Sequence, residues 1–316
     1  MLNVGQLAGG IDRAVAMPVK SNEYSARPML KRSDCGVFRM NDETPVEQWN
    51  TSAEGWAHWA ARATDYLVPA TERMLDLANV KSGCRVLDVG CGSGEQTIIA
   101  ARRVGDTGHV LAIDIAAPMI TATEKTVREA GMRNVSTRVC PADALVDNGE
   151  RFDAAISRLV LMLIPDPVAA ARAVQTVLRT GGLFAAIVTG DPTKTTYNAI
   201  ALDILARHGG KTDWEDRPGS IRSLVDPARL EAVMANAGFT DVAVNSISTI
   251  QRLESAAAAT TMIREGFAFY KAMIAHLPQQ RQDAAWNELE QALRRFEDAD
   301  GFAGPGEVNL VVGRKP

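Results

Sequence analysis

The sequence predicts a doubly wound α/β fold, and three observations support this fold class. From Cys84 onward, short β-branched or aliphatic runs alternate with amphipathic runs. The expected strands are apolar on both faces, as in a parallel sheet covered by helices on each side. The first expected strand leads directly into a glycine-rich turn and then into a helical pattern. The expected strands are 86–89, 110–113, 135–139, 152–157, 183–188, 242–253 and 307–313, and the expected helices between them are 96–104, 118–130, 168–178, 197–208 and 227–237.

Helical segments on both sides of this core predict a cap. Thr51 and Glu54 have the spacing of a capping box, which predicts a helix to about Tyr66, and Pro69 precedes a second helix to Ala78. Two more helices are expected at 255–274 and 281–296, and Gly181 and Gly182 are expected to close helix 168–178. We therefore divide the chain into an irregular leader or lid (1–43), cap helices (44–80), the core domain (81–254 and 303–316) and an inserted helical cap for substrate (255–302).

Composition excludes several classes of function. A formal net charge of -4 and a pI near 5.7 give no attraction for phosphate backbones, so nucleic acid is not expected as a partner. The four cysteines match no zinc or disulfide pattern, and no metal site is expected. No apolar run approaches the roughly 20 residues that span a bilayer, and no signal peptide is evident, which predicts a cytoplasmic protein. Residues 1–43 are a candidate segment for exchange between subunits of a homo-oligomer.

The segment 86–94 carries the strongest functional signal. Gly90, Gly92 and Gly94 follow the first strand, and glycine alone readily allows positive φ and close approach of a ligand to backbone N–H groups at a helix N-terminus. A dinucleotide fingerprint would need another glycine at the position of Glu95. The G-x-G-x-G spacing instead favours a small zwitterionic ligand. Asp88 precedes the turn and is placed to accept from an amino group or to order the loop.

With these motifs, the chain resembles the class I S-adenosylmethionine-dependent methyltransferases. Segments 152–158, 161–167, 177–182 and 311–316 are similar to the branch of ubiquinone and menaquinone C-methyltransferases. The resemblance implies a seven-stranded Rossmann-like sheet of order 3-2-1-4-5-7-6, with the seventh strand antiparallel, and S-adenosylmethionine as cofactor. It also implies that Asp114 holds the ribose hydroxyls, that Asp143 receives the adenine amino group, and that Ile115 and Met119 pack on adenine. The expected cofactor-binding set is Asp88, Gly90, Cys91, Gly92, Gly94, Asp114, Ile115, Met119, Asp143, Ala144 and Arg158.

The distribution of aromatic residues predicts the nature of the methyl acceptor. Of the 17 Phe, Trp and Tyr residues, only Phe152 and Phe184 fall between positions 82 and 190. Helical spacing predicts two stripes in the cap, which either pack as ordinary core or line a chamber for an isoprenoid, quinone or aromatic natural product. The residues of these stripes that we expect to bind substrate are Trp56, Trp59, Tyr66, Phe267 and Tyr270.

These expectations define a leading function and its rivals. The leading hypothesis is C-methylation of a small, largely apolar acceptor, because an electron-rich carbon needs no base before attack. O-methylation of a polyketide or aromatic metabolite is the alternative, and an NAD(P)-linked oxidoreductase and a non-catalytic cofactor-binding scaffold are rivals from other classes. His208 and His276 are the candidate catalytic bases, since each ends a helix expected near the acceptor.

Overall fold

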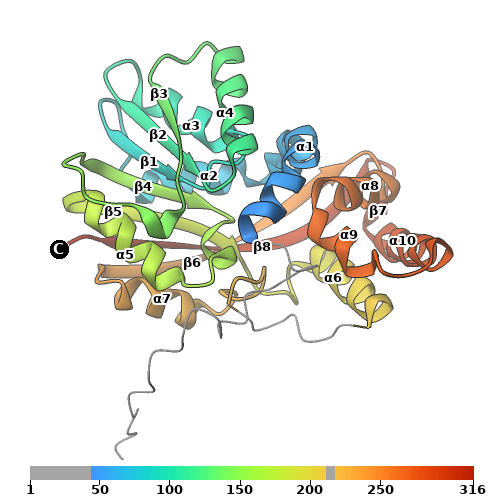
Figure 1. Ribbon diagram of the computed structural model, residues 1–316. Coiled ribbons are helices and arrows are strands. Elements are labelled where there is room, and N and C mark those ends of the chain that lie inside the picture. The colour runs from blue at the N-terminus through green and yellow to red at the C-terminus, as the bar shows by residue number, and fades with distance from the viewer. Residues whose placement is uncertain (1–43, 211–217) are drawn as a thin grey trace, which may run out of the picture. The chain divides into compact units, whose positions relative to one another are not determined.

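The computed structural model describes residues 44–210 and 218–316, and in these ranges the strands form one eight-stranded sheet (Figure 1). The order is β3-β2-β1-β4-β5-β8-β6, and β7 pairs only with β8. Pairing is parallel from β3 to β5, and β8 runs antiparallel to both β5 and β6. The predicted order is therefore confirmed, with β8 as its seventh strand. The strands are β1 Arg85–Val89, β2 His109–Asp114, β3 Val135–Val139, β4 Phe152–Arg158, β5 Leu178–Thr189, β6 Thr240–Leu253, β7 Glu297–Asp298 and β8 Gly301–Arg314.

Helices cover both faces of the sheet, as predicted. Because successive side chains of a strand point to opposite faces, Val86 and Leu87 belong to different hydrophobic clusters. The cluster of Val86 includes residues of α2 (Val68–Leu77) and α3 (Glu95–Val104), and that of Leu87 includes residues of α5 (Pro167–Val177) and α7 (Pro227–Asn236). Helix α4 (Ala117–Glu129) packs against α3, β2 and β3. The expectation of strands apolar on both faces fails at β3, which is an edge strand with exposed or half-buried side chains throughout.

The cap contains α1 (Pro45–Thr64), α6 (Thr196–Gly209) and the helices of residues 255–302 (Figure 1). This corrects the predicted division at two helices, because α2 packs on the sheet rather than in the cap, and α6 packs on cap helices rather than in the core domain. Helix α1 contacts both α4 of the core and α8 (Ala256–Gly266), so it connects the sheet to the insertion. Helix α10 (Gln279–Leu293) packs on α6 and α8, and α9 (Ala268–Ile274) packs on α6. One hydrophobic cluster joins these four helices, and it includes Tyr197, Tyr270 and Trp286. Short 3-10 turns complete the chain at Asp65–Leu67 (η1), Ala142–Ala144 (η2), Leu161–Leu163 (η3) and Arg294–Phe296 (η4).

Three local predictions are corrected by the structure. The capping box is formed by Thr44 and Glu47, so α1 begins at Pro45, and Thr51 lies within the helix with its hydroxyl donating to the Glu47 carbonyl. The helix expected at 255–274 is interrupted at Phe267, whose backbone (φ -127°, ψ 88°) is not helical. Helix α5 ends at Val177 without a glycine cap, because β5 begins at the next residue.

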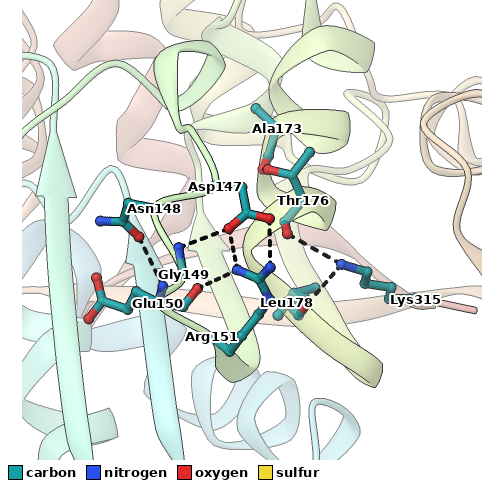
Figure 2. Close-up of polar contacts among 9 residues, drawn as sticks. All are labelled: Asp147, Asn148, Gly149, Glu150, Arg151, Ala173, Thr176, Leu178 and Lys315. Atoms are coloured by element: carbon teal, nitrogen blue, oxygen red, sulfur yellow. Dashed lines mark hydrogen bonds and ion pairs between the residues drawn. The ribbon is translucent and has the colours of Figure 1, made fainter.

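A polar cluster fixes the loop between β3 and β4 and the C-terminal end of α5 (Figure 2). Arg151 donates two hydrogen bonds to the Asp147 carboxylate, each 2.6 Å long, and these bonds, together with one from the Gly149 N–H, lower the pKa of Asp147 to about 2. Lys315 Nζ donates to the Leu178 carbonyl at 2.8 Å and to the Thr176 carbonyl at 3.3 Å. A cation at these carbonyls stabilises the end of the helix. This cluster lines neither of the cavities described below.

Several expectations concern parts of the chain or properties that the fold does not test. The leader or lid at 1–43, with its exchange between subunits, lies outside the described residues. In residues 44–210 and 218–316, no helix is both long enough and apolar enough to cross a bilayer. The same residues contain no group of three or more His, Cys, Asp or Glu side chains suited to a metal ion. Cys84, Cys91 and Cys140 are free thiols.

Candidate active site

The glycine-rich turn between β1 and α3 has the backbone that its sequence predicts. Gly90, Gly92 and Gly94 have φ values of 72°, 58° and 97°, a region that other residues rarely adopt. A Cβ at Gly90 would lie 2.4 Å from a methyl group of Val160, and one at Gly92 would lie 3.1 Å from Trp56 Nε1. Gly94 is the N-cap of α3. Glycine therefore allows Val160 and Trp56 to lie close to the backbone of the turn. The turn also leads into the N-terminus of α3, where helix N-termini stabilise polar groups of a ligand.

Asp114 lies at the end of β2, beside this turn. Its Oδ2 accepts from Gly92 N and its Oδ1 accepts from Ala116 N, both at 3.0 Å. Burial raises the pKa of Asp114, and the two backbone hydrogen bonds oppose this rise. A carboxylate has about four lone-pair sites, so Asp114 can hold the turn and still accept hydrogen bonds from a ligand.

Asp88 has no contact with the cavity that the turn borders. It is completely buried, accepts from Thr97 Oγ1 at 2.6 Å, and also accepts from Gln96 Nε2. Thr97 and Gln96 belong to the first turn of α3. Of the two roles considered for Asp88, the structure therefore favours ordering of the loop.

Asp88 also makes stability depend on pH. Burial raises its pKa to about 7 from 3.8, against the hydrogen bond from Thr97 and the charge of Arg158. The pKa of Asp88 is higher in the folded state than the value of 3.8 for the unfolded chain. The contribution of Asp88 to the free energy of unfolding is therefore fully present below pH 3.8 and is lost as pH rises to about 7. The substitution Asp88→Asn removes this titration. We expect the unfolding free energy of the unchanged protein, relative to the variant, to fall by on the order of a few kcal/mol over that interval. Urea unfolding at several pH values measures it, and a constant or rising difference contradicts the assignment.

The first cavity has a volume of about 300 Å³ and opens beside the glycine turn. Of the predicted cofactor residues, Asp88, Gly94 and Ala144 do not line this cavity. Those that do line it are Gly90, Cys91, Gly92, Asp114, Ile115, Met119, Asp143 and Arg158.

Gln96 and Trp49 are among the residues lining this cavity that were not predicted. Gln96 Oε1 is fully buried and has no hydrogen-bond partner among the described residues. Trp49 packs with Ala53, Ala116 and Met119 where α1 meets α4. A local signal for Gln96 existed, because it lies two residues after Gly94 in the first turn of α3. No local signal indicated Trp49, since its position depends on how α1 packs against α4.

Arg158 ends β4 and is buried at the wall of the first cavity. Its Nη1 donates to Thr71 Oγ1 at 3.0 Å. Burial lowers the pKa of Arg158, while the charges of Glu95 and Asp88 oppose that shift. The charge of Arg158 in turn opposes the rise that burial causes in the pKa of Tyr66. Arg158 lines the first cavity and not the second, whereas Tyr66 lines the second and not the first.

The second cavity, of about 140 Å³, adjoins the first. None of its described lining residues is Asp, Glu, His, Lys or Arg, and its polar side chains are neutral amides, hydroxyls and indoles. Its aromatic residues come from α1, η1, α6, α9 and the break between α8 and α9: Trp49, Trp56, Tyr66, Tyr197, Phe267, Phe269 and Tyr270. Both cavities share one wall, formed by Pro45, Trp49, Trp56, Leu159, Leu163 and Pro165.

Four of the five predicted substrate residues line the second cavity, and Trp59 does not. The Trp56 and Phe267 rings meet edge to face, with centroids 5.5 Å apart. Trp59 instead packs with Ala63 and Met262 and donates from Nε1 to Glu265 at 3.1 Å. Its placement in the substrate chamber is therefore wrong, because Trp59 faces α8.

Neither candidate histidine lines either of these two cavities. His208 Nε2 lies 2.7 Å from the Glu288 carboxylate, where α6 packs on α10. His276 is exposed in the turn that follows α9. The structure thus gives neither side chain access to a substrate in these cavities, and His208 contributes to helix packing.

Comparison with known proteins identifies the class of protein that this fold and site define. A family model described as "Methyltransferase domain" matches residues 80–202. Over 175 residues the chain is 30% identical to the ubiquinone/menaquinone biosynthesis C-methyltransferase UbiE of Vibrio campbellii, a match that covers 52% of this chain and 68% of that protein. The chain belongs to the class I S-adenosylmethionine-dependent methyltransferase family. Within that family it is similar to the UbiE-like branch.

Two further matches are limited, one by the share of the relative that it covers and the other by its low sequence identity. The chain is 40% identical over 114 residues to the nocamycin O-methyltransferase of Saccharothrix syringae, which covers 35% of this chain and only 40% of that enzyme. The structure of phosphoethanolamine N-methyltransferase 2 of Haemonchus contortus, in complex with S-adenosylmethionine, superposes with a TM-score of 0.51 at 18% identity. That match covers 89% of this chain and 61% of the other, and it shows a shared fold. Because the chain belongs to a family of methyltransferases, we no longer consider it an NAD(P)-linked oxidoreductase.

The cofactor of this family is S-adenosylmethionine, and the residues of the first cavity fit it. Gly90 and Gly92 line this cavity with backbone alone, so a ligand can approach their main-chain atoms closely. Gln96 Oε1 is an unpartnered acceptor, which suits the ligand's ammonium group, and Arg158 is a buried cation, which suits its carboxylate. Asp114 and Asp143 are carboxylates on the same cavity, and both can accept hydrogen bonds from neutral donors.

Proposed function

We propose that this chain transfers the methyl group of S-adenosylmethionine to a carbon atom of a small, largely apolar acceptor. The observation that carries the proposal is the shared wall of the two cavities. A cofactor in the first cavity and an acceptor in the second would meet at Trp56 and Leu159. Isoprenoid, quinone and aromatic skeletons suit the aromatic lining of the second cavity.

In this proposal, separate residues bind each part of the cofactor. The Asp114 carboxylate accepts from the ribose hydroxyls, and Asp143 accepts from the adenine amino group. Ile115 and Met119 pack on the adenine ring. Gln96 and Arg158 bind the amino-acid end, where the backbone of the glycine turn also approaches. This assignment is supported by the position of all six side chains on the first cavity.

The chemistry requires alignment more than it requires a base. When bound, S-adenosylmethionine would supply an activated methyl group: its sulfur–carbon bond would break as the new carbon–carbon bond forms, and the acceptor would then lose a proton. The chain's contribution is to hold the acceptor carbon in line and to exclude water with its apolar wall. Carbon methylation is favoured because the described lining of the second cavity has no carboxylate or imidazole to remove a proton from a hydroxyl. The aromatic rings can also stabilise positive charge during transfer.

O-methylation is the second candidate, and one observation favours it. The chain is 40% identical over 114 residues to an enzyme named an O-methyltransferase, whereas it is 30% identical over 175 residues to the UbiE relative. An acidic enol or phenol could be methylated on oxygen without a strong protein base.

Labelled product analysis tests the proposal. Calorimetry is first used to compare adenosylhomocysteine with NADH, and we expect only adenosylhomocysteine to bind. The protein is then incubated with S-adenosylmethionine carrying a ¹³C methyl group and with a panel of quinols, phenols and polyketides. We expect a product whose ¹³C resonance is that of a carbon-bound methyl. A methoxy resonance would overturn C-methylation, and binding of NADH alone would overturn the whole assignment.

A further inference from the structure

One polar side chain of the second cavity is buried without a partner. Ser220 is 8% exposed, lines the second cavity, and its Oγ makes no hydrogen bond with any described residue. A buried hydroxyl left unpaired costs about 1–3 kcal/mol, so native proteins rarely keep one without a reason. Ser220 does not line the first cavity.

The turn that carries Ser220 is held in place by other groups. Ser223 N donates to the Ser220 carbonyl at 3.0 Å, and Ser223 Oγ donates to the Met162 carbonyl at 2.7 Å. Thr189 Oγ1 donates to the Ile221 carbonyl. These contacts anchor the turn to η3 and to the end of β5. The Ser220 hydroxyl is therefore not needed to hold its own backbone.

Neighbouring hydroxyls in the second cavity differ from Ser220 because they have protein partners. Tyr270 Oη donates to the Asn198 carbonyl at 3.4 Å, and the Tyr66 and Tyr197 hydroxyls interact with each other, which affects the pKa of both. Burial raises the pKa of all three phenols, so they stay neutral. Ser220 is thus the fully buried hydroxyl of the described lining that remains available to a ligand.

We infer that Ser220 binds a carbonyl or hydroxyl oxygen of the acceptor, so that the substrate is an apolar ring system bearing an oxygen. This inference rests on the proposed function and specifies its substrate class. A serine hydroxyl can donate to a carbonyl or exchange hydrogen bonds with a hydroxyl. Because Ser220 lines the second cavity and not the first, the oxygen that it holds would lie outside the cavity assigned to the cofactor. A different atom of the ring system then faces the methyl group, which agrees with methylation at carbon.

A pair of two-ring probes tests this inference in the full chain. Equilibrium dialysis with saturating adenosylhomocysteine measures the affinities of 1-naphthol and naphthalene, which differ by one hydroxyl. We expect the unchanged protein to bind 1-naphthol more tightly than naphthalene. In Ser220→Ala the hydroxyl of bound 1-naphthol has no partner, so the ratio of the two affinities should fall about tenfold. The thermal midpoint of Ser220→Ala should be no lower than that of the unchanged protein, because no protein hydrogen bond is lost.

Thr249→Val provides a matched control. Thr249 Oγ1 is also buried and unpartnered, but Thr249 lies on β6 and lines neither cavity. Its loss should leave the probe preference unchanged. The inference is overturned if neither probe binds, if Ser220→Ala keeps the full preference, or if Thr249→Val reduces it equally. Calorimetry distinguishes failure of the Ser220 inference from failure of the proposed function. If only the role of Ser220 is wrong, adenosylhomocysteine still binds to the protein.

Discussion

Replacing Asp114 with alanine should weaken the binding of adenosylhomocysteine by about 1–3 kcal/mol, which is roughly 5- to 150-fold in affinity. Two effects contribute to this loss. The ribose hydroxyls lose a charged acceptor, and the backbone N–H groups of Gly92 and Ala116 lose the carboxylate oxygens that they reach at 3.0 Å. Since Gly92 lies in the glycine turn, we expect the substitution to remove the proposed ribose contact and also to loosen the turn beside it.

Two variants make the Asp114 result interpretable by calorimetry. Asp114→Asn keeps the shape of the side chain but turns an NH₂ group toward one of the two backbone donors, so it should also bind weakly. Asp166→Ala is the control, because Asp166 Oδ1 caps α5 through Ala169 N and lines neither cavity. It should reduce stability by about 0.5–2 kcal/mol and leave the affinity unchanged. Unchanged affinity in Asp114→Ala would remove Asp114 from the cofactor site.

Replacing Gly90 with alanine should be the most damaging change of a single methyl group in the glycine turn. Its φ of 72° is strained for any L side chain, and the new Cβ would lie 2.4 and 2.7 Å from the two methyl groups of Val160. Backbone strain and overpacking each cost about 1–3 kcal/mol. Gly90 N and Cys91 N both donate to the Ile113 carbonyl, so relief of the clash would also shift the following residue. We expect lower stability by urea unfolding and at least tenfold weaker binding of adenosylhomocysteine.

A double variant separates the two costs at Gly90. Val160→Ala removes the methyl groups that clash but does not change φ, so Gly90→Ala with Val160→Ala should recover part of the stability lost by Gly90→Ala alone. The interaction energy of this cycle measures the steric contact. If Gly90→Ala matches the unchanged protein in both stability and affinity, the described shape of the turn is wrong.

The core of the fold was predictable because its signals are local. A strand buried on both faces needs a continuous apolar run, and the turn after β1 needs glycine wherever φ is positive. Asp114, the last residue of β2, was assigned through the resemblance to the methyltransferase family. Local signals failed where two patterns matched, as at Thr44 and Thr51, because either threonine has a glutamate three residues later.

The acceptor cavity could be predicted only in part. Helical spacing placed Trp56 and Trp59 together, but Trp59 faces α8 while Trp56 meets Phe267. The break at Phe267 is not visible in a helical pattern, and it allows this ring to reach the cavity. Leu159 has a φ of 58° and lies on the wall shared by both cavities, although leucine gives no local signal for that backbone. Strained residues of this kind are common at functional sites.

The sequence by itself determined the strands and helices of the core and the glycine turn, because residues close in the chain specify each of them. The order of the sheet and the proposed roles of the strand-end acids came from the resemblance to a family. Only the tertiary structure decided which side chains line the second cavity. Trp56, Leu159, Ser220 and Tyr270 come from segments separated by 50 to about 100 residues, and they share a cavity only because α1, the end of β4, the turn at 218–224 and α9 pack together. Packing between distant segments depends on shape and burial summed over the whole core, which no local pattern in the sequence records.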